Sequence, residues 1–135
     1  MGIRVYIDGA SIGNPGKMGI GYLIYKDTIL LKKKSFYLGI GTNNFAEYMA
    51  LLASLIEVLS MGEKECYVYS DSNLLCEQLK GNFKVKSKNI YPLFVMVKDV
   101  VAKFKSFSIN YISRENNKDA DRLAKEAANF LTIIN

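Results

Sequence analysis

The chain of 135 residues contains no histidine and only two cysteines, Cys66 and Cys76. A zinc site needs cysteine and histidine ligands at short spacing, and neither cysteine has such partners nearby. The absence of histidine also removes imidazole, the commonest general base in enzymes. Zinc chemistry and histidine-based catalysis are therefore excluded. Two isolated cysteines predict buried thiols in a reducing compartment.

Long apolar runs are also missing, although half of the residues are hydrophobic. No stretch approaches the length that spans a membrane, and the first residues enter a strand pattern without the apolar block of a signal peptide. We therefore expect a cytoplasmic protein with no membrane partner. Low-complexity segments, linkers and internal repeats are absent too, so we expect one domain over residues 1–135.

Lysine and arginine outnumber aspartate and glutamate by 18 to 13, which gives a formal net charge of +5. This balance favours a polyanionic partner, although mildly basic surfaces also occur on proteins that bind no nucleic acid. The glycines near residues 13–21 do not form a nucleotide-binding loop. Ser11 stands where a Walker loop begins with glycine, and Ile24 stands where a dinucleotide motif starting at Gly19 needs its third glycine. These glycines are interpreted as turn residues.

Hydrophobic periodicity predicts the order βββαβα(α)βα. Strand patterns occupy residues 3–8, about 18–26 and about 29–38, and apolar residues at helical spacing follow from 45 to 59. A strand at about 66–70, a short helix at about 72–79, a helix starting near Pro92, a strand at 107–112 and a helix from about residue 117 complete the chain. This order predicts an α/β protein with a mixed sheet and helices on its faces.

Four carboxylates lie where predicted strands end or helices begin: Asp8, Glu47, Asp71 and Asp121. If the first and fourth strands are parallel neighbours, Asp8 and Asp71 emerge at the same edge of the sheet, where α/β folds place their sites. Acids without histidine or cysteine ligands are typical of a site for hard divalent cations. On a basic protein, this group indicates metal-dependent chemistry on a phosphate chain.

Each acid has a structural alternative. Asp8 is also compatible with an Asp-Gly turn, and Asp71 with the N-cap of the following helix. Glu47 resembles the last residue of a capping box that starts at Asn44. Asp121 is also compatible with an ion pair to Lys125, one helical turn further along.

The last helix offers two acids, Asp119 and Asp121. Residues two apart face different directions on a helix, so only one is expected to join the other carboxylates. The apolar residues Leu123 and Ala124 place the packed face close to Asp121. We therefore choose Asp121.

Four sequence blocks resemble the signature blocks of type 1 ribonuclease H, in the same order and at similar spacing: Asp8 to Gly16, Thr42 to Glu47, Tyr69 to Asn73, and Asn117 to Ala124. The resemblance implies the ribonuclease H-like fold, with a five-stranded mixed sheet flanked by helices. It also implies a monomeric endoribonuclease that cuts the RNA strand of RNA/DNA hybrids and leaves 5′-phosphate and 3′-hydroxyl ends. Two Mg²⁺ ions, or Mn²⁺ in their place, are expected on Asp8, Glu47, Asp71 and Asp121.

The resemblance further implies a set of substrate contacts. Distinguishing RNA from DNA requires contacts to the 2′-hydroxyl, and asparagine suits this role because its amide both donates and accepts. Turn and cap chemistry is the alternative for these asparagines. The predicted substrate-binding residues are Gly9, Asn14, Asn43, Asn44, Asn73, Arg114 and Asn117.

The chain departs from the family pattern in two features. Many members have a histidine in the loop before the last aspartate; here Arg114 either fills part of that role or contacts a phosphate or Glu115. The basic helical protrusion of some members is replaced by a shorter segment, whose lysines either grip phosphates or are simply solvated. These lysines are Lys80, Lys84, Lys86 and Lys88.

Two other functions remain open. A binding module of the same fold that has lost nuclease activity is disfavoured because all four acids are present. A nuclease for double-stranded RNA, or a reverse transcriptase domain, is the other alternative. We expect no polymerase to be attached, since the first strand begins at residue 3.

Overall fold

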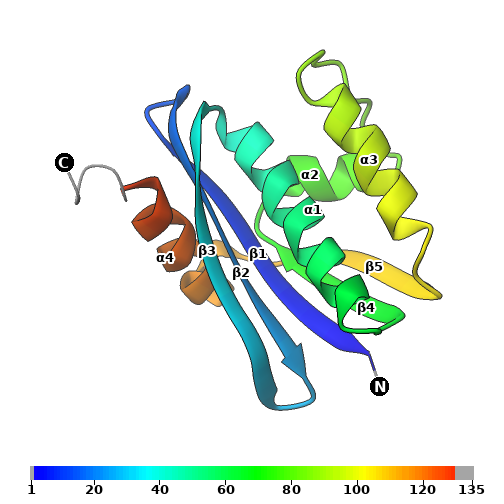
Figure 1. Cartoon of the computed structure of the whole chain (residues 1–135). Coiled ribbons are helices and arrows are strands. Elements are labelled where there is room, and N and C mark those ends of the chain that lie inside the picture. Colours follow the sequence, from blue (N-terminus) through cyan, green and yellow to red (C-terminus); the bar gives the residue numbers. More distant parts are fainter. Residues whose placement is uncertain (1, 130–135) are drawn as a thin grey trace.

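The computed structural model describes residues 2–129, so the predicted domain of residues 1–135 extends beyond the described part at both ends (Figure 1). The observed order of elements matches the predicted βββαβα(α)βα. In chain order the elements are β1 (Ile3–Ile12), β2 (Gly16–Lys26), β3 (Ile29–Gly41), α1 (Asn43–Ser60), β4 (Glu65–Ser70), α2 (Asn73–Leu79), α3 (Tyr91–Val101), β5 (Ser106–Tyr111), the short 3₁₀ helix η1 (Arg114–Asn116) and α4 (Lys118–Ala128).

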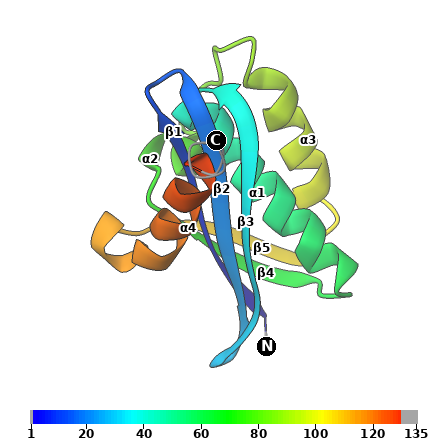
Figure 2. The same ribbon diagram turned by 60° about the vertical axis from the view of Figure 1, so that its left-hand side comes forward.

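The five strands form one mixed sheet in the order β3-β2-β1-β4-β5. β2 pairs antiparallel with both β1 and β3, and β1, β4 and β5 run parallel. Helix α1 packs on one face of the sheet, with α3 beside α1, and α4 packs on the other face against β1, β2 and β3 (Figure 2). This arrangement confirms the predicted α/β class and the five-stranded mixed sheet. In the described part of the chain, no helix has both the length and the apolar character needed to cross a membrane.

The side chains of β1 alternate between the two faces of the sheet, as they must in a strand. Ile3, Val5 and Ile7 are fully buried in the main core, where α1 contributes Leu51 and Leu55. Asp8 therefore belongs to the opposite face, on which α4 lies.

The first strand is longer than predicted, and this changes the setting of Asp8. Its parallel pairing with β4 ends at Ile7 and Ser70, whereas its antiparallel pairing with β2 continues to Ile12. The interpretation of Asp8 as part of an Asp-Gly turn is therefore wrong. Asp8 lies within β1, at the point where β4 leaves it.

Gly19 and Gly21 lie inside β2, within the strand predicted at about residues 18–26. A Cβ atom on Gly19 would collide with the backbone of α4 at Ala124 and Ala128, and one on Gly21 would lie 2.5 Å from the Cβ of Leu123. Helix α4 thus rests directly on the backbone of β2. This close approach sets the position of Asp121 relative to the sheet.

Candidate active site

Three of the four predicted carboxylates come together at the edge of the sheet where β1 and β4 separate. Asp8 lies in β1, Glu47 in the second turn of α1, and Asp71 directly after β4. Each offers a carboxylate oxygen, and the three oxygens lie within 4.8 Å of one another. Residues far apart in the sequence therefore converge on one point.

Glu47 is held by the backbone of the neighbouring strand. The N–H of Gly9 donates a short hydrogen bond to Oε1 of Glu47. The N-cap of α1 is Thr42, whose hydroxyl accepts from the N–H of Phe45 at 3.2 Å, so the capping-box alternative for Glu47 is wrong. A Cβ on Gly9 would collide with the backbone of Ala46 and Glu47. The absence of a side chain at Gly9 is thus what lets β1 approach the start of α1.

Asp71 does not cap α2. The N-cap is Ser72, whose hydroxyl accepts a hydrogen bond from the N–H of Leu75 at 3.2 Å, so the N-cap alternative for Asp71 is wrong. Instead, the side-chain amide of Asn117 donates to Oδ2 of Asp71 at 3.2 Å and to the carbonyl of Ile7 at 2.8 Å. Asn117 is only 2% exposed and does not line the cavity of the carboxylates. Within the protein Asn117 positions Asp71, and its predicted contact with substrate stays a prediction.

The two acids of α4 lie in different surroundings. Asp121 faces the cavity that Asp8, Glu47 and Asp71 line, and it also pairs with Lys125 at 3.1 Å. Asp119 is exposed, pairs with Arg122 at 3.3 Å and lines a separate cavity. The structure therefore brings Asp121 rather than Asp119 to the other carboxylates. Its role as a metal ligand stays a prediction.

The carboxylates raise one another's pKa values. Burial and the charge of Asp71 raise the pKa of Asp8 from 3.8 to about 7. Burial and the charge of Asp8 raise the pKa of Glu47 well above 4.5, and burial raises the pKa of Asp71. Buried like charges oppose each other's ionisation, and a bound cation removes this cost. Oxygen donors alone, carrying this much negative charge, fit Mg²⁺ or Mn²⁺.

The carboxylates line a cavity of about 530 Å³. Four of the predicted substrate-binding residues also line it: Gly9, Asn43, Asn44 and Arg114. Sequence reasoning missed Lys125 and Asn129. Both follow Asp121 at steps of four residues, and helical periodicity could have placed all three on the same face of α4.

The remaining predicted contacts lie outside the lining of this cavity. The side chain of Asn14 accepts from the backbone N–H of Asn43 at 3.1 Å, and the side chain of Asn43 accepts from the N–H of Ser11 at 2.7 Å. The loop between β1 and β2 is thereby fixed to the start of α1, so Asn14 supports Asn43. Asn73 is exposed at the first residue of α2.

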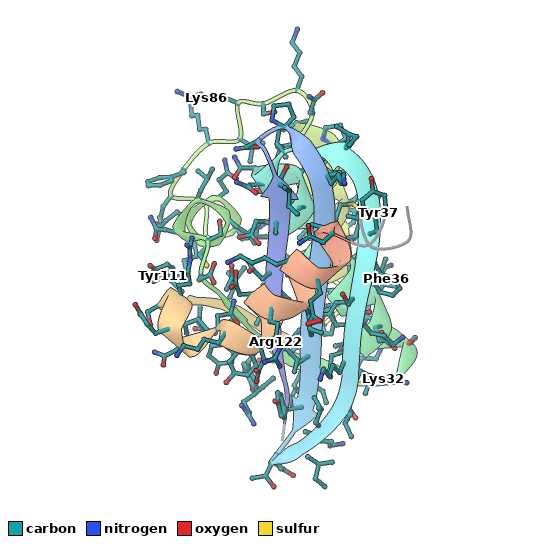
Figure 3. The ribbon with its side chains drawn as sticks, turned by 90° about the vertical axis from the view of Figure 1, so that its left-hand side faces the viewer. Lys32, Phe36, Tyr37, Lys86, Tyr111 and Arg122 are labelled. Carbon is teal, nitrogen blue, oxygen red and sulfur yellow. The ribbon has the colours of Figure 1, made fainter. Side chains whose placement is uncertain are left out.

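The lysine-rich segment forms the loop between α2 and α3. Figure 3 shows Lys86 on this loop at the edge of the molecule. Its base is anchored by Gln78, whose amide donates to the carbonyl of Lys84 at 3.2 Å and accepts from the hydroxyl of Tyr48 at 2.6 Å. All four side chains are exposed, and their role stays a prediction: Lys80, Lys84, Lys86 and Lys88.

Comparison with known proteins supports the assignment of this fold and site to one family. The model of a family described as reverse transcriptase-like matches residues 7–127. The bifunctional protein Rv2228c of Mycobacterium tuberculosis is 35% identical over 130 residues, which cover 94% of this chain. The chain spans only 35% of the length of that relative.

Two crystal structures are similar over nearly their whole length. Ribonuclease H1 from Halobacterium salinarum superposes with a TM-score of 0.92 at 30% identity, covering 96% of this chain and 99% of that one. LC11-RNase H1, solved in complex with an RNA/DNA hybrid, has a TM-score of 0.91 at 34% identity, with 96% and 99% covered. The chain belongs to the ribonuclease H family.

Proposed function

We propose that this protein hydrolyses the RNA strand of RNA/DNA hybrids, with two divalent cations held by Asp8, Glu47, Asp71 and Asp121. The observation that carries the proposal is the convergence of three carboxylate oxygens within 4.8 Å, beside a fourth acid in the same cavity. The similar structure that contains an RNA/DNA hybrid supports the choice of substrate. The cleavage leaves 5′-phosphate and 3′-hydroxyl ends.

Cations held by these carboxylates would supply activation of a water and stabilisation of the leaving 3′-oxygen of an in-line displacement. The residues of the chain hold the carboxylates ready for them. The Gly9 N–H orients Glu47, and Asn117 orients Asp71. Lys125 holds Asp121 at the rim of the cavity. Because no histidine is present, none of these steps uses an imidazole.

Recognition of the RNA strand is assigned to the residues around Gly9, Asn43 and Asn44. Asn43 accepts from the N–H of Ser11 through Oδ1, which orients its Nδ2 as a donor for a 2′-hydroxyl. The positive charge of Arg114, which lines the same cavity, suits a phosphate of the substrate.

The working metal is proposed to be Mg²⁺, with Mn²⁺ as a substitute, since carboxylate oxygens suit both ions. We also propose that the protein acts in the cytoplasm as a monomer. The two free and buried cysteines, Cys66 and Cys76, support a reducing location.

Cleavage of an end-labelled RNA/DNA hybrid with Mg²⁺ tests the proposal, with duplex RNA and duplex DNA as parallel substrates. We expect hybrid-specific cutting that Asp71→Asn abolishes and that Asp119→Asn, the matched change on the exposed acid, leaves intact. Equal cutting of duplex RNA would assign a different substrate. Folded protein that binds the hybrid but does not cut it with Mg²⁺ or Mn²⁺ would be a binding module.

A further inference from the structure

A second cavity of about 540 Å³ lies on the α4 side of the sheet. Its walls come from β1 and β2 on one side, through Arg4, Tyr6, Leu23 and Tyr25, and from residues 115–120 of η1 and the start of α4 on the other. It shares no lining residue with the cavity of the carboxylates. The proposed cleavage reaction leaves this cavity without a role.

The strand wall of this cavity is an ordered aromatic surface. The rings of Tyr6 and Tyr69 stack with centroids 5.0 Å apart, and Tyr25 meets Tyr6 edge-on at 5.9 Å. The guanidinium of Arg4 lies 5.8 Å from the ring centre of Tyr6 and 5.1 Å from that of Tyr25. Its Nη1 donates to the Tyr6 hydroxyl at 3.0 Å, and its Nη2 donates to the carbonyl of Asp27 at 2.7 Å. A wall of rings and a planar cation, held before any ligand arrives, suits a flat π-system.

Asn117 also lines this second cavity, and one of its polar atoms is unsatisfied. Its Nδ2 makes both of its donations, to Ile7 and Asp71. Its Oδ1 is buried and has no hydrogen-bond partner within residues 2–129. Buried amide oxygens in proteins are nearly always paired. A donor that reaches this oxygen from the cavity, from a water or from a ligand, would satisfy it.

The charges around the cavity favour a neutral ligand. Arg4 and Lys118 contribute positive charge, and Glu115 and Asp119 contribute negative charge. No single sign dominates, unlike in the catalytic cavity, and the guanidinium of Arg4 is already engaged by Tyr6 and Asp27. The charge of this cavity therefore suits neither a metal ion nor an isolated phosphate. Its aromatic wall and the oxygen of Asn117 suit a flat, neutral molecule with an N–H donor at its edge.

We propose that the second cavity binds a nucleobase with an exocyclic amino group. The base lies against the tyrosine wall, and its amino group donates to Oδ1 of Asn117. The base belongs either to a free nucleoside or to an unpaired nucleotide of a nucleic acid strand. This inference does not require the proposed cleavage to be correct, although Asn117 also donates to Asp71 and so links the two cavities.

Titration with adenosine, without divalent cations, tests this site. Adenosine has no phosphate, so it lacks the group that the catalytic cavity is proposed to bind. In ¹⁵N-labelled protein we expect amide shifts at Leu23, Tyr25 and Ala120 and none at Asn44. N6,N6-dimethyladenosine keeps the ring but loses the N–H donors, and we expect it to bind roughly five-fold to ten-fold more weakly.

Matched variants separate the aromatic wall from general surface effects. Tyr25→Ala is expected to weaken adenosine binding roughly ten-fold, whereas Tyr25→Phe retains the ring and the affinity. Tyr111→Ala is the control, because Tyr111 is 53% exposed and lines neither cavity (Figure 3). Circular dichroism checks that each variant is folded. If Tyr25→Ala does not fold, the proposal is tested by the amide shifts of the wild type and by the comparison of adenosine with N6,N6-dimethyladenosine.

Strands with a single unpaired adenine or an abasic residue at the same position identify the source of the base. Binding of adenosine itself assigns the site to a free nucleoside. Binding that appears only with the unpaired adenine, and not with the abasic strand, assigns it to a nucleic acid strand. Three results would overturn the proposal: equal binding of adenosine and its dimethyl form, shifts centred on Asn44, or no binding of adenosine or of the strand at millimolar concentration.

Discussion

Asn117 donates a hydrogen bond of 3.2 Å to the carboxylate of Asp71 while its buried amide also holds the carbonyl of Ile7 at 2.8 Å. One side chain thereby joins the start of α4 to the middle of β1 and to an acid of the proposed site. Since Asp71 follows β4, the positions of three elements depend on this amide. Asn117 is a positioning residue in the site.

Asn117→Ala tests this role. Loss of a charge-assisted and a neutral hydrogen bond, both buried, is expected to cost about 2 kcal/mol of unfolding free energy or more. The cleavage rate should fall because Asp71 loses its orientation. KM should change little because the contacts of the substrate remain. The control is Asn116→Ala, whose exposed side chain bonds only the hydroxyl of Ser113 at 2.9 Å. Equal effects of the two changes would contradict the positioning role.

Gly9→Ala is expected to damage both stability and cleavage. The added methyl group would collide with the backbone of Ala46 and Glu47, so β1 and α1 would have to separate, at roughly 3 kcal/mol. Gly39→Ala is the comparison, because Gly39 has a φ of 85° but open space around it. The strain there is expected to cost about 1 kcal/mol and leave cleavage unchanged. Urea unfolding and a hybrid-cleavage assay measure the two effects.

The pKa of Asp8 predicts how stability depends on pH when no cation is bound. Because its pKa is about 7 when folded and near 3.8 when unfolded, the folded state binds the proton more tightly. Its contribution to stability is therefore complete below about pH 4 and is lost as the pH rises to about 7. The charges of Asp71 and Asp121 raise the pKa of Asp8 further and strengthen this loss, whereas a hydrogen bond with the side chain of Glu47 opposes it.

Thermal melts in EDTA of the wild type and Asp8→Asn measure this dependence. The two proteins should have similar melting temperatures at pH 4, and the variant should be more stable at pH 8. Added Mg²⁺ should raise the melting temperature of the wild type at pH 8 and have much less effect on the variant. A wild type whose stability rose between pH 4 and 7 relative to the variant would contradict the raised pKa.

Local signals in the sequence were enough to predict the order of elements and to select the four acids as candidates, of which the structure brings the carboxylate oxygens of Asp8, Glu47 and Asp71 within 4.8 Å of one another. Apolar residues recur at different spacings in strands and helices, so each element could be predicted from its own segment. Asp8 and Asp71 could be placed together once their strands were taken as parallel neighbours. The end of β1 could not be predicted in this way. It depends on pairing with β2 beyond Ile7, which the local pattern around Gly9 concealed.

The other differences also arise from contacts between distant residues. Gly19 and Gly21 lie in a predicted strand, but their role in leaving room for α4, about a hundred residues later, has no local signal. The hydrogen bonds of Asn117 to Ile7 and Asp71 join residues far apart in the sequence, and its place in a signature block gave no sign of them. Such roles depend on which elements meet, and that is a property of the folded chain.

The choice between Asp119 and Asp121 gives the sharpest test of the proposed metal site. The two acids are two residues apart on α4, yet only Asp121 lines the cavity of Asp8, Glu47 and Asp71. Asp121→Asn keeps the size of the side chain and removes its charge, so cleavage should be abolished if the cations need this ligand. Asp119→Asn breaks only an exposed pair with Arg122, and pairs of this kind contribute little. Isothermal titration calorimetry of each variant with Mn²⁺ should show weakened Mn²⁺ binding for Asp121→Asn alone. Full activity of Asp121→Asn, or loss of activity in Asp119→Asn, would move the fourth ligand to a different residue.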